Sequence, residues 1–166
     1  MIDLLHQDIQ ALVKRLASNL LEQGQTLAVA ESCTGGWLSK VLTDPAGSSA
    51  WFLGGVVSYN NSAKLSCLHV NEASLSEFGA VSEQVAHEMA TGAQQVFGSS
   101  LAVSISGIAG PSGGTESKPV GLVWLAVKQL NNPPHMVRKV FDGNRDEVRS
   151  KAVKMALQLL IDATTN

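Results

Sequence analysis

The chain has 166 residues, of which 45% are hydrophobic and 16% are charged, and its formal net charge is -2. These proportions are typical of a globular protein with one core of ordinary size, so we expect a single domain over residues 1–166. The small negative charge comes without a basic stripe or an acidic tail, which argues against direct contact with nucleic acid.

Cysteine usage and hydropathy favour a cytoplasmic location. Cys33 and Cys67 belong to no CxxC or other metal-ligand spacing, so we expect two reduced thiols and no metal site. No segment reaches the run of about 18 apolar residues that a membrane span needs. The first residues lack the uninterrupted apolar core of a signal peptide. We therefore expect a cytoplasmic protein without membrane contact.

Helices and strands alternate in the predicted first half of the chain. Apolar residues recur at helical spacing over residues 3–23. The apolar positions of this helix are Leu4, Leu5, Ile9, Leu12, Val13, Leu16, Leu20 and Leu21. A short apolar strand over 26–30 and a helix over 37–42 follow. An apolar segment with two glycines then predicts a buried strand over 51–59.

The second half is predicted to hold further helices, three strands and a final helix. The expected ranges are 60–67 and 71–78 for short helices, a longer helix opening at Ser82, strands over 101–110, 120–128 and 135–142, and a last helix over 144–161. One apolar face of the longer helix is formed by Val85, Met89, Ala93 and Val96. Alternation followed by a hairpin predicts an α/β fold, a three-layer α/β/α sandwich with a mixed, mainly parallel sheet.

Six small or polar residues, Glu31 to Gly36, join the first strand to the next helix. Free backbone N–H groups at such a helix start hold a phosphate or stabilise an oxyanion. Ser32 could cap the helix, bind an anion or attack an electrophile. The segment is neither a nucleophile elbow nor a P-loop. On residue type alone, a cap or turn role for Ser32 or Thr34 is the more frequent one.

The segment SYNNSAK contains two side chains that can move protons, Tyr59 and Lys64. A serine nucleophile needs a base, and the four histidines are scattered without an acidic partner. Lysine can be that base if burial lowers its pKa by about three units from ~10.4. A lysine on a short helix is more often a solvated charge, and both interpretations stay open.

A glycine-rich loop follows the strand over 101–110. Gly107, Gly110, Gly113 and Gly114 allow close approach of a ligand to the backbone, although their spacing is not that of a dinucleotide-binding fingerprint. Long structured loops in compact domains are often functional. Lys118, later in the loop, is either an anion contact or a solvated charge.

Two arginines, Arg145 and Arg149, lie one turn apart near the start of the last helix. Cations there oppose the helix macrodipole, which hints at an anionic partner such as a phosphate. Asp146 and Glu147 supply favourable charge at the same place, and a salt bridge is the simpler explanation for at least one of the arginines.

Five segments in this order resemble the hallmark segments of the CinA C-terminal domain family: AESCTGG, YNNSAK, GAVSE, SGIAGPSGGTESKPVG and FDGNRDEVR. The resemblance covers nearly the whole chain. It implies an amidohydrolase that converts nicotinamide mononucleotide (NMN) to nicotinate mononucleotide and ammonia in NAD recycling. It implies no metal or organic cofactor, and a homodimer.

The resemblance also implies roles for particular residues. Ser32 corresponds to the nucleophile and Lys64 to its base, which takes the hydroxyl proton directly or through Tyr59. The oxyanion donors are expected among the N–H groups of residues 33–35, and Arg145 is the candidate for the phosphate. The expected substrate-binding residues are Cys33, Thr34, Gly35, Gly36, Asn60, Ser106, Gly107, Gly110, Gly113 and Arg145.

Two alternatives use the same residues differently. A nucleotide-binding or regulatory module would hold phosphate on the same N–H groups and glycines without turnover, with Ser32 only as a hydrogen-bond donor. A partner protein in DNA uptake or repair is a third class, and the net charge argues against direct DNA contact by such a protein.

Overall fold

The computed structural model describes residues 2–165, and for residues 2–6 it describes the backbone alone. The predicted apolar side chains of Leu4 and Leu5 therefore lie outside the described residues. The elements in chain order are α1 (Ile2–Gln23), β1 (Leu27–Glu31), α2 (Trp37–Thr43), the 3-10 helix η1 (Ser48–Ala50), β2 (Phe52–Val57), α3 (Asn61–Leu68), α4 (Glu72–Phe78), α5 (Glu83–Phe97), β3 (Leu101–Gly107), β4 (Leu122–Gln129), β5 (His135–Val140) and α6 (Arg145–Ala163).

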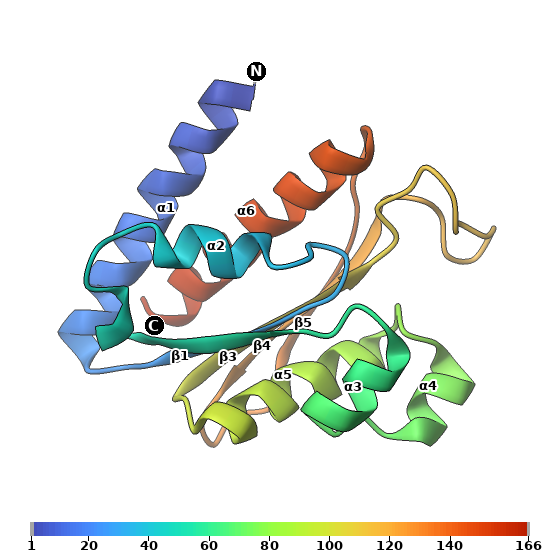
Figure 1. Cartoon of the computed structure of the whole chain (residues 1–166), viewed down its shortest axis with the longest axis horizontal. Helices are drawn as coiled ribbons and strands as arrows, with labels where there is room; N and C mark the ends of the chain where they lie inside the picture. The colour runs from blue at the N-terminus through green and yellow to red at the C-terminus, as the bar shows by residue number, and fades with distance from the viewer. Residues whose placement is uncertain (1, 166) are drawn as a thin grey trace.

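The strands form one mixed sheet in the order β2-β1-β3-β4-β5. The pairs β1–β2 and β1–β3 are parallel, whereas β3–β4 and β4–β5 are antiparallel, so β4 runs against its neighbours. Helices α1, α2 and α6 cover one face of the sheet, and α3, α4 and α5 cover the other (Figure 1). This arrangement confirms the predicted α/β fold with a mixed sheet.

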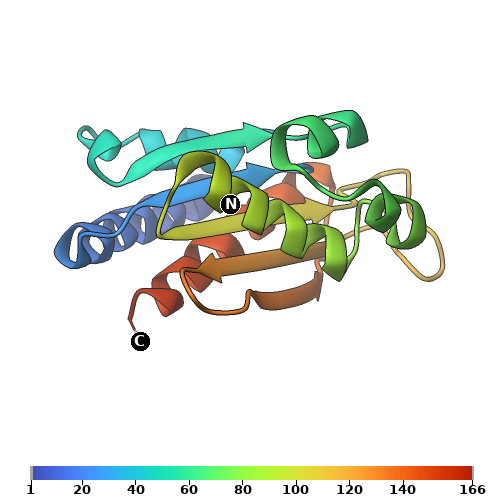
Figure 2. The same ribbon diagram turned by 90° about the horizontal axis from the view of Figure 1, so that it is seen from below.

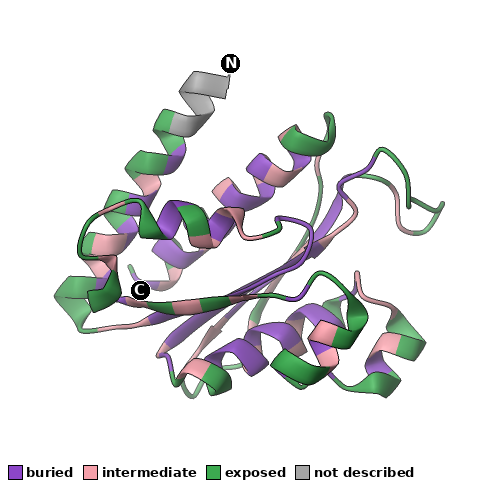
Figure 3. Cartoon of the chain, viewed as in Figure 1, coloured by how far each residue is buried: buried purple, intermediate pink, exposed green. Residues whose placement is uncertain are grey.

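Each face of the sheet has its own apolar core. On one face, buried side chains of α1 and α6 pack against the central strands. On the opposite face, α5 packs against the strands with smaller residues. Figure 3 shows the burial concentrated on β1, β3 and the inner sides of the helices. In the part of the chain that is described, no helix is both long and apolar enough to cross a membrane.

Strand β2 differs from its prediction as a buried strand. It lies at the edge of the sheet, and its residues alternate between half-buried and exposed. Leu53 is 41% and Val57 47% exposed, so this edge strand is not fully covered by helices. Val96, expected on the buried face of α5, is also exposed, since α5 covers the sheet with the face formed by Val85, Met89 and Ala93.

The carboxyl ends of β1, β2 and β3 lie at the same end of the sheet (Figure 2). The three segments that follow these strands are the Glu31–Gly36 turn, the start of α3 and the glycine-rich loop. Parallel neighbours in a sheet necessarily end on the same side, and this is where α/β proteins commonly bind ligands. Three stretches that are far apart in sequence are thereby brought together.

Helix α3 is held close to α5 by a glycine. A Cβ atom on Gly92 of α5 would overlap the carbonyl oxygen of Leu68, the last residue of α3. Gly92 and Leu68 are both buried, so the two backbones touch without space for a side chain.

We predict that Gly92→Ala destabilises the protein by about 1–3 kcal/mol, because an added methyl group in a close-packed contact forces the backbones apart. Gln95→Ala on the exposed side of α5 is the matched control and should be nearly neutral. Urea unfolding of both variants measures the difference. Equal free energies of unfolding for the two variants would contradict the close approach of α3 and α5.

Candidate active site

Lys64 and Ser32 meet at the floor of a cavity, at the ends of two neighbouring strands. Ser32 directly follows β1, and Lys64 lies one turn into α3, which follows β2. The Nζ atom of Lys64 is 3.1 Å from Ser32 Oγ. Lys64 is 1% and Ser32 8% exposed, so this contact between residues 32 positions apart is shielded from bulk water.

The remaining partners of the Lys64 amine are neutral backbone groups. Nζ donates to the carbonyl oxygen of Ser58 at 2.7 Å and to that of Tyr59 at 3.4 Å. Among the ion pairs of the described residues, none includes Lys64. Burial lowers the pKa of Lys64 from its ordinary value of 10.5, an effect that the nearby Cys33 opposes. The environment therefore favours the neutral amine.

The sequence predicted that the N–H groups at the start of α2 are free to bind a ligand. In the structure they are already hydrogen-bonded to the protein itself. The buried carboxylate of Glu31 accepts from the N–H groups of Gly36 at 3.1 Å, Leu38 at 3.0 Å and Ser39 at 2.8 Å. The Ser39 hydroxyl donates to the same carboxylate at 2.7 Å. An acidic side chain of the protein thus occupies the place where a phosphate would bind, and Gly36, whose N–H group is already used, does not line the cavity.

The expected oxyanion donors at residues 33–35 differ in their availability. The N–H group of Gly35 donates to the Ser32 carbonyl oxygen at 3.1 Å and is already used. Thr34 is fully buried and does not line the cavity, whereas Cys33 does. The Cys33 N–H group is therefore the strongest oxyanion candidate of the three.

The cavity has a volume of about 270 Å³ and is lined by the three segments at the strand ends, by the connection between α4 and α5, and by the start of α6. Nine residues expected at the site line it: Ser32, Cys33, Tyr59, Lys64, Ser106, Gly107, Gly110, Gly113 and Arg145. Six lining residues were not singled out from the sequence: Asn61, Ala80, Val81, Ile108, Ala109 and Ser112. All six lie inside the segments YNNSAK, GAVSE and SGIAGPSGGTESKPVG, so the sequence signal was the segment and not the individual residue.

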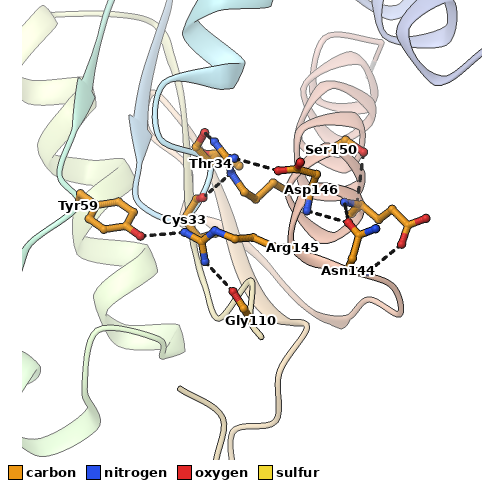
Figure 4. A network of polar contacts seen from close by, with 10 residues as sticks. Cys33, Thr34, Tyr59, Gly110, Asn144, Arg145, Asp146 and Ser150 are labelled. Atoms are coloured by element: carbon orange, nitrogen blue, oxygen red, sulfur yellow. Dashed lines mark hydrogen bonds and ion pairs between the residues drawn. The ribbon is translucent and has the colours of Figure 1, made fainter. Parts of the chain in front are cut away.

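Arg145 connects two sides of the cavity, as Figure 4 shows. Its guanidinium group donates to the carbonyl oxygen of Gly110 at 2.7 Å and to the hydroxyl group of Tyr59 at 3.0 Å. Tyr59 is 59% exposed, so its ring stands at the rim. The hydroxyl of Tyr59 thus faces Arg145, and the direct contact of Lys64 with Ser32 needs no relay through it.

Three further residues singled out from the sequence, Asn60, Lys118 and Gly35, do not line the cavity. The Asn60 side chain accepts from the N–H group of Ser62 at 3.0 Å and caps α3. Lys118 donates to the carbonyl oxygen of Phe78 and ties the glycine-rich loop to α4. Gly35 takes a positive φ of 60° within the turn, a left-handed conformation that favours glycine.

The two cysteines are free thiols, and the described side chains contain no cluster that could bind a metal ion. Cys33 is buried and Cys67 is exposed. Within the described residues, no three His, Cys, Asp or Glu side chains gather where they could hold a metal ion. Burial raises the pKa of the Cys33 thiol to about 11, which keeps it protonated at neutral pH.

The sequence model of the CinA C-terminal domain family matches residues 9–164. The chain belongs to this family. It is 49% identical over 153 residues to the nicotinamide-nucleotide amidohydrolase PncC of Escherichia coli K12, covering 92% of this chain and 93% of that relative. A CinA-like protein of Syntrophomonas wolfei is 47% identical over an alignment of 161 residues that covers 92% of this chain but 36% of that longer protein.

Solved structures of CinA proteins share the fold. The competence/damage inducible protein CihA of Agrobacterium tumefaciens superposes with a TM-score of 0.91 at 42% identity, covering 96% of each chain. The competence damage-inducible protein A of Klebsiella pneumoniae superposes with a TM-score of 0.92 at 35% identity, covering 95% of this chain and 98% of that one.

The burial of Lys64 should be visible in the pH dependence of stability. Since its pKa is lowered on folding, the unfolded chain binds the proton more tightly, and folding carries a penalty below the folded pKa that fades as pH rises toward 10.5. We predict that Lys64→Met gains stability relative to wild type at low pH, and that this relative gain shrinks as pH rises.

Thermal unfolding of wild type and Lys64→Met between pH 6 and 10.5 measures this trend. Lys40→Met is the control for losing a lysine, because the Lys40 side chain is 61% exposed. A difference in Tm between Lys64→Met and wild type that stays constant or widens with rising pH would contradict the lowered pKa.

Proposed function

We propose that this chain hydrolyses the carboxamide of NMN to nicotinate mononucleotide and ammonia, as part of pyridine nucleotide recycling. The proposal is supported above all by the buried Lys64 amine, 3.1 Å from the hydroxyl oxygen of Ser32 at the floor of a cavity. The similarity to the amidohydrolase PncC over 92% of the chain supplies the substrate. We also propose a cytoplasmic homodimer, as the family resemblance implies.

Neutral Lys64 has the hydrogen-bonding capacity of a general base in this geometry. Its two N–H groups are directed to the carbonyl oxygens of Ser58 and Tyr59, which leaves the nitrogen lone pair for the hydroxyl proton of Ser32. Direct transfer of that proton activates Ser32 for attack on the carboxamide carbon. A base with a pKa lowered toward neutrality performs this step best.

Attack forms a C–O bond to Ser32 and a tetrahedral intermediate, whose oxyanion accepts from the Cys33 N–H group. When the C–N bond breaks, Lys64 returns the proton to the leaving nitrogen, and ammonia departs. A water molecule then gives a proton to Lys64 and attacks the ester carbon. Nicotinate mononucleotide leaves, and Ser32 recovers its hydroxyl proton.

The upper part of the cavity provides contacts for the rest of the nucleotide. The glycine-rich loop brings backbone close to the ligand at Gly107, Gly110 and Gly113, and the guanidinium group of Arg145 is the cation that lines the cavity beside Lys64. We assign the phosphate to Arg145, because a guanidinium group binds phosphate in two-point geometry. Tyr59, hydrogen-bonded to Arg145, would orient it.

We predict that purified wild type releases ammonia and nicotinate mononucleotide from NMN without added metal. Ser32→Ala should lose this turnover, and Lys64→Met should lower kcat by about 10²–10⁴-fold because the general base is gone. Cys33→Ala should retain turnover, since its backbone N–H group remains and its thiol is not the nucleophile. Ammonia release and chromatography of the product measure all four proteins.

Cys67→Ala, an exposed position on the same helix as Lys64, controls for handling of the variants. Turnover by Ser32→Ala at the wild-type rate would remove Ser32 from the mechanism. Binding of NMN by wild type without any product would favour a nucleotide-binding module over an enzyme.

A further inference from the structure

The turn that carries Ser32 is held from outside the cavity by Arg149. The Nε atom of Arg149 donates to the carbonyl oxygen of Cys33 at 3.1 Å, and its Nη2 atom donates to that of Thr34, also at 3.1 Å. These are long-range contacts, from α6 to the residues directly after Ser32 (Figure 4). Arg149 does not line the cavity, so any effect on chemistry is transmitted through the turn.

Three consecutive carbonyl groups of this turn are hydrogen-bonded. Gly35 N–H binds the Ser32 oxygen, and the guanidinium group of Arg149 binds the next two oxygens. The peptide bonds here are trans, so each N–H group points opposite to the carbonyl of its own peptide plane. The Ser32 carbonyl and the Cys33 N–H group share one peptide plane, so fixing the carbonyl sets the direction of the N–H group. Fixing the Cys33 carbonyl restricts rotation of the next peptide plane, between Cys33 and Thr34.

Two groups that do not belong to the cavity contact Arg149, and the one on Asp146 is an exposed, weak ion pair. Its Nη1 atom is 3.3 Å from an Asp146 carboxylate oxygen, and its guanidinium carbon lies 5.5 Å from the centre of the Trp37 ring. A planar, five-donor guanidinium group satisfies two carbonyls, a carboxylate and an aromatic face at once, which a lysine cannot do.

We propose that Arg149 is a positioning residue for the nucleophile: it clamps the turn so that Ser32 Oγ and the Cys33 N–H group stay aligned in the transition state. The proposal rests on the proposed serine-dependent hydrolysis. It assigns Arg149 a role different from that of Arg145, one helical turn away, which reaches the cavity directly. Loss of the clamp should lower kcat and leave KM nearly unchanged, because the substrate contacts are elsewhere.

The experiment compares wild type, Arg149→Met, Arg149→Lys and Asp146→Asn in NMN hydrolysis, together with their Tm values. Misplacement of a reacting group by an ångström costs on the order of 100-fold in rate, so we expect Arg149→Met to lower kcat by about that factor. Arg149→Lys, which keeps the charge but offers a single donor point, should fall between. Asp146→Asn removes the ion pair and keeps the clamp, so its kcat should stay within about twofold of wild type.

A second readout does not depend on NMN. Ser32 can attack the sulfur of a sulfonyl fluoride: the S–O bond forms, the S–F bond breaks, fluoride leaves and the hydroxyl proton passes to Lys64. Mass spectrometry follows the sulfonyl group on Ser32, and labelling should slow in Arg149→Met but not in Asp146→Asn. If wild type is labelled but does not hydrolyse NMN, the proposed substrate fails while the clamp is still tested.

Any one of three results overturns the clamp. Arg149→Met with wild-type kcat and labelling rate would show that the turn holds itself. An effect of Arg149→Met on KM alone would assign Arg149 to substrate binding. If Asp146→Asn lowers both Tm and activity as much as Arg149→Met does, Arg149 acts through stability. If Arg149→Met does not fold, the intermediate kcat expected of Arg149→Lys decides the question.

Discussion

The burial of the Lys64 amine is the constraint on which the site depends. A charged ammonium group that is 1% exposed is costly unless an anion compensates it, and its partners are two carbonyl oxygens and one hydroxyl. Folding therefore shifts the amine toward its neutral form. Helix α3, which carries Lys64, is held against the turn after β1 by two features: it follows the end of β2, and it packs closely on α5 at Gly92. The fold therefore keeps the Lys64 amine away from water.

A second constraint is that the backbone N–H groups at the start of α2 are hydrogen-bonded to a side chain of the protein. Glu31 ends β1 inside the protein, and its carboxylate takes three N–H groups of the following helix. The helix terminus is thereby removed from ligand binding, and the turn is fixed at its far end. Arg149 fixes the same turn from α6. An anionic side chain and a cationic side chain thus hold the nucleophile segment on opposite sides without entering the cavity.

Local patterns predicted the elements well, because apolar periodicity and capping residues such as Ser82 and Asn144 act within a few residues. The pairing of Ser32 with Lys64 came from the family resemblance, whereas the strand pattern placed each residue only near the end of a strand. The edge position of β2 could not be predicted, since strand order is set by long-range packing. Neither could the different roles of Arg145 and Arg149, because one helical turn decides which arginine reaches the cavity.

Burial acts in opposite directions on two neighbouring groups of the site. It lowers the pKa of Lys64 and raises the pKa of Cys33 to about 11, because desolvation disfavours the ammonium form of one and the thiolate form of the other. A thiolate–ammonium pair would stabilise each partner, but desolvation is the larger influence on both groups. The same buried environment therefore favours the neutral amine of Lys64, which can act as a base for Ser32, and keeps the thiol of Cys33 protonated and unreactive. Serine, although intrinsically the weaker nucleophile, is then the group that the site can activate.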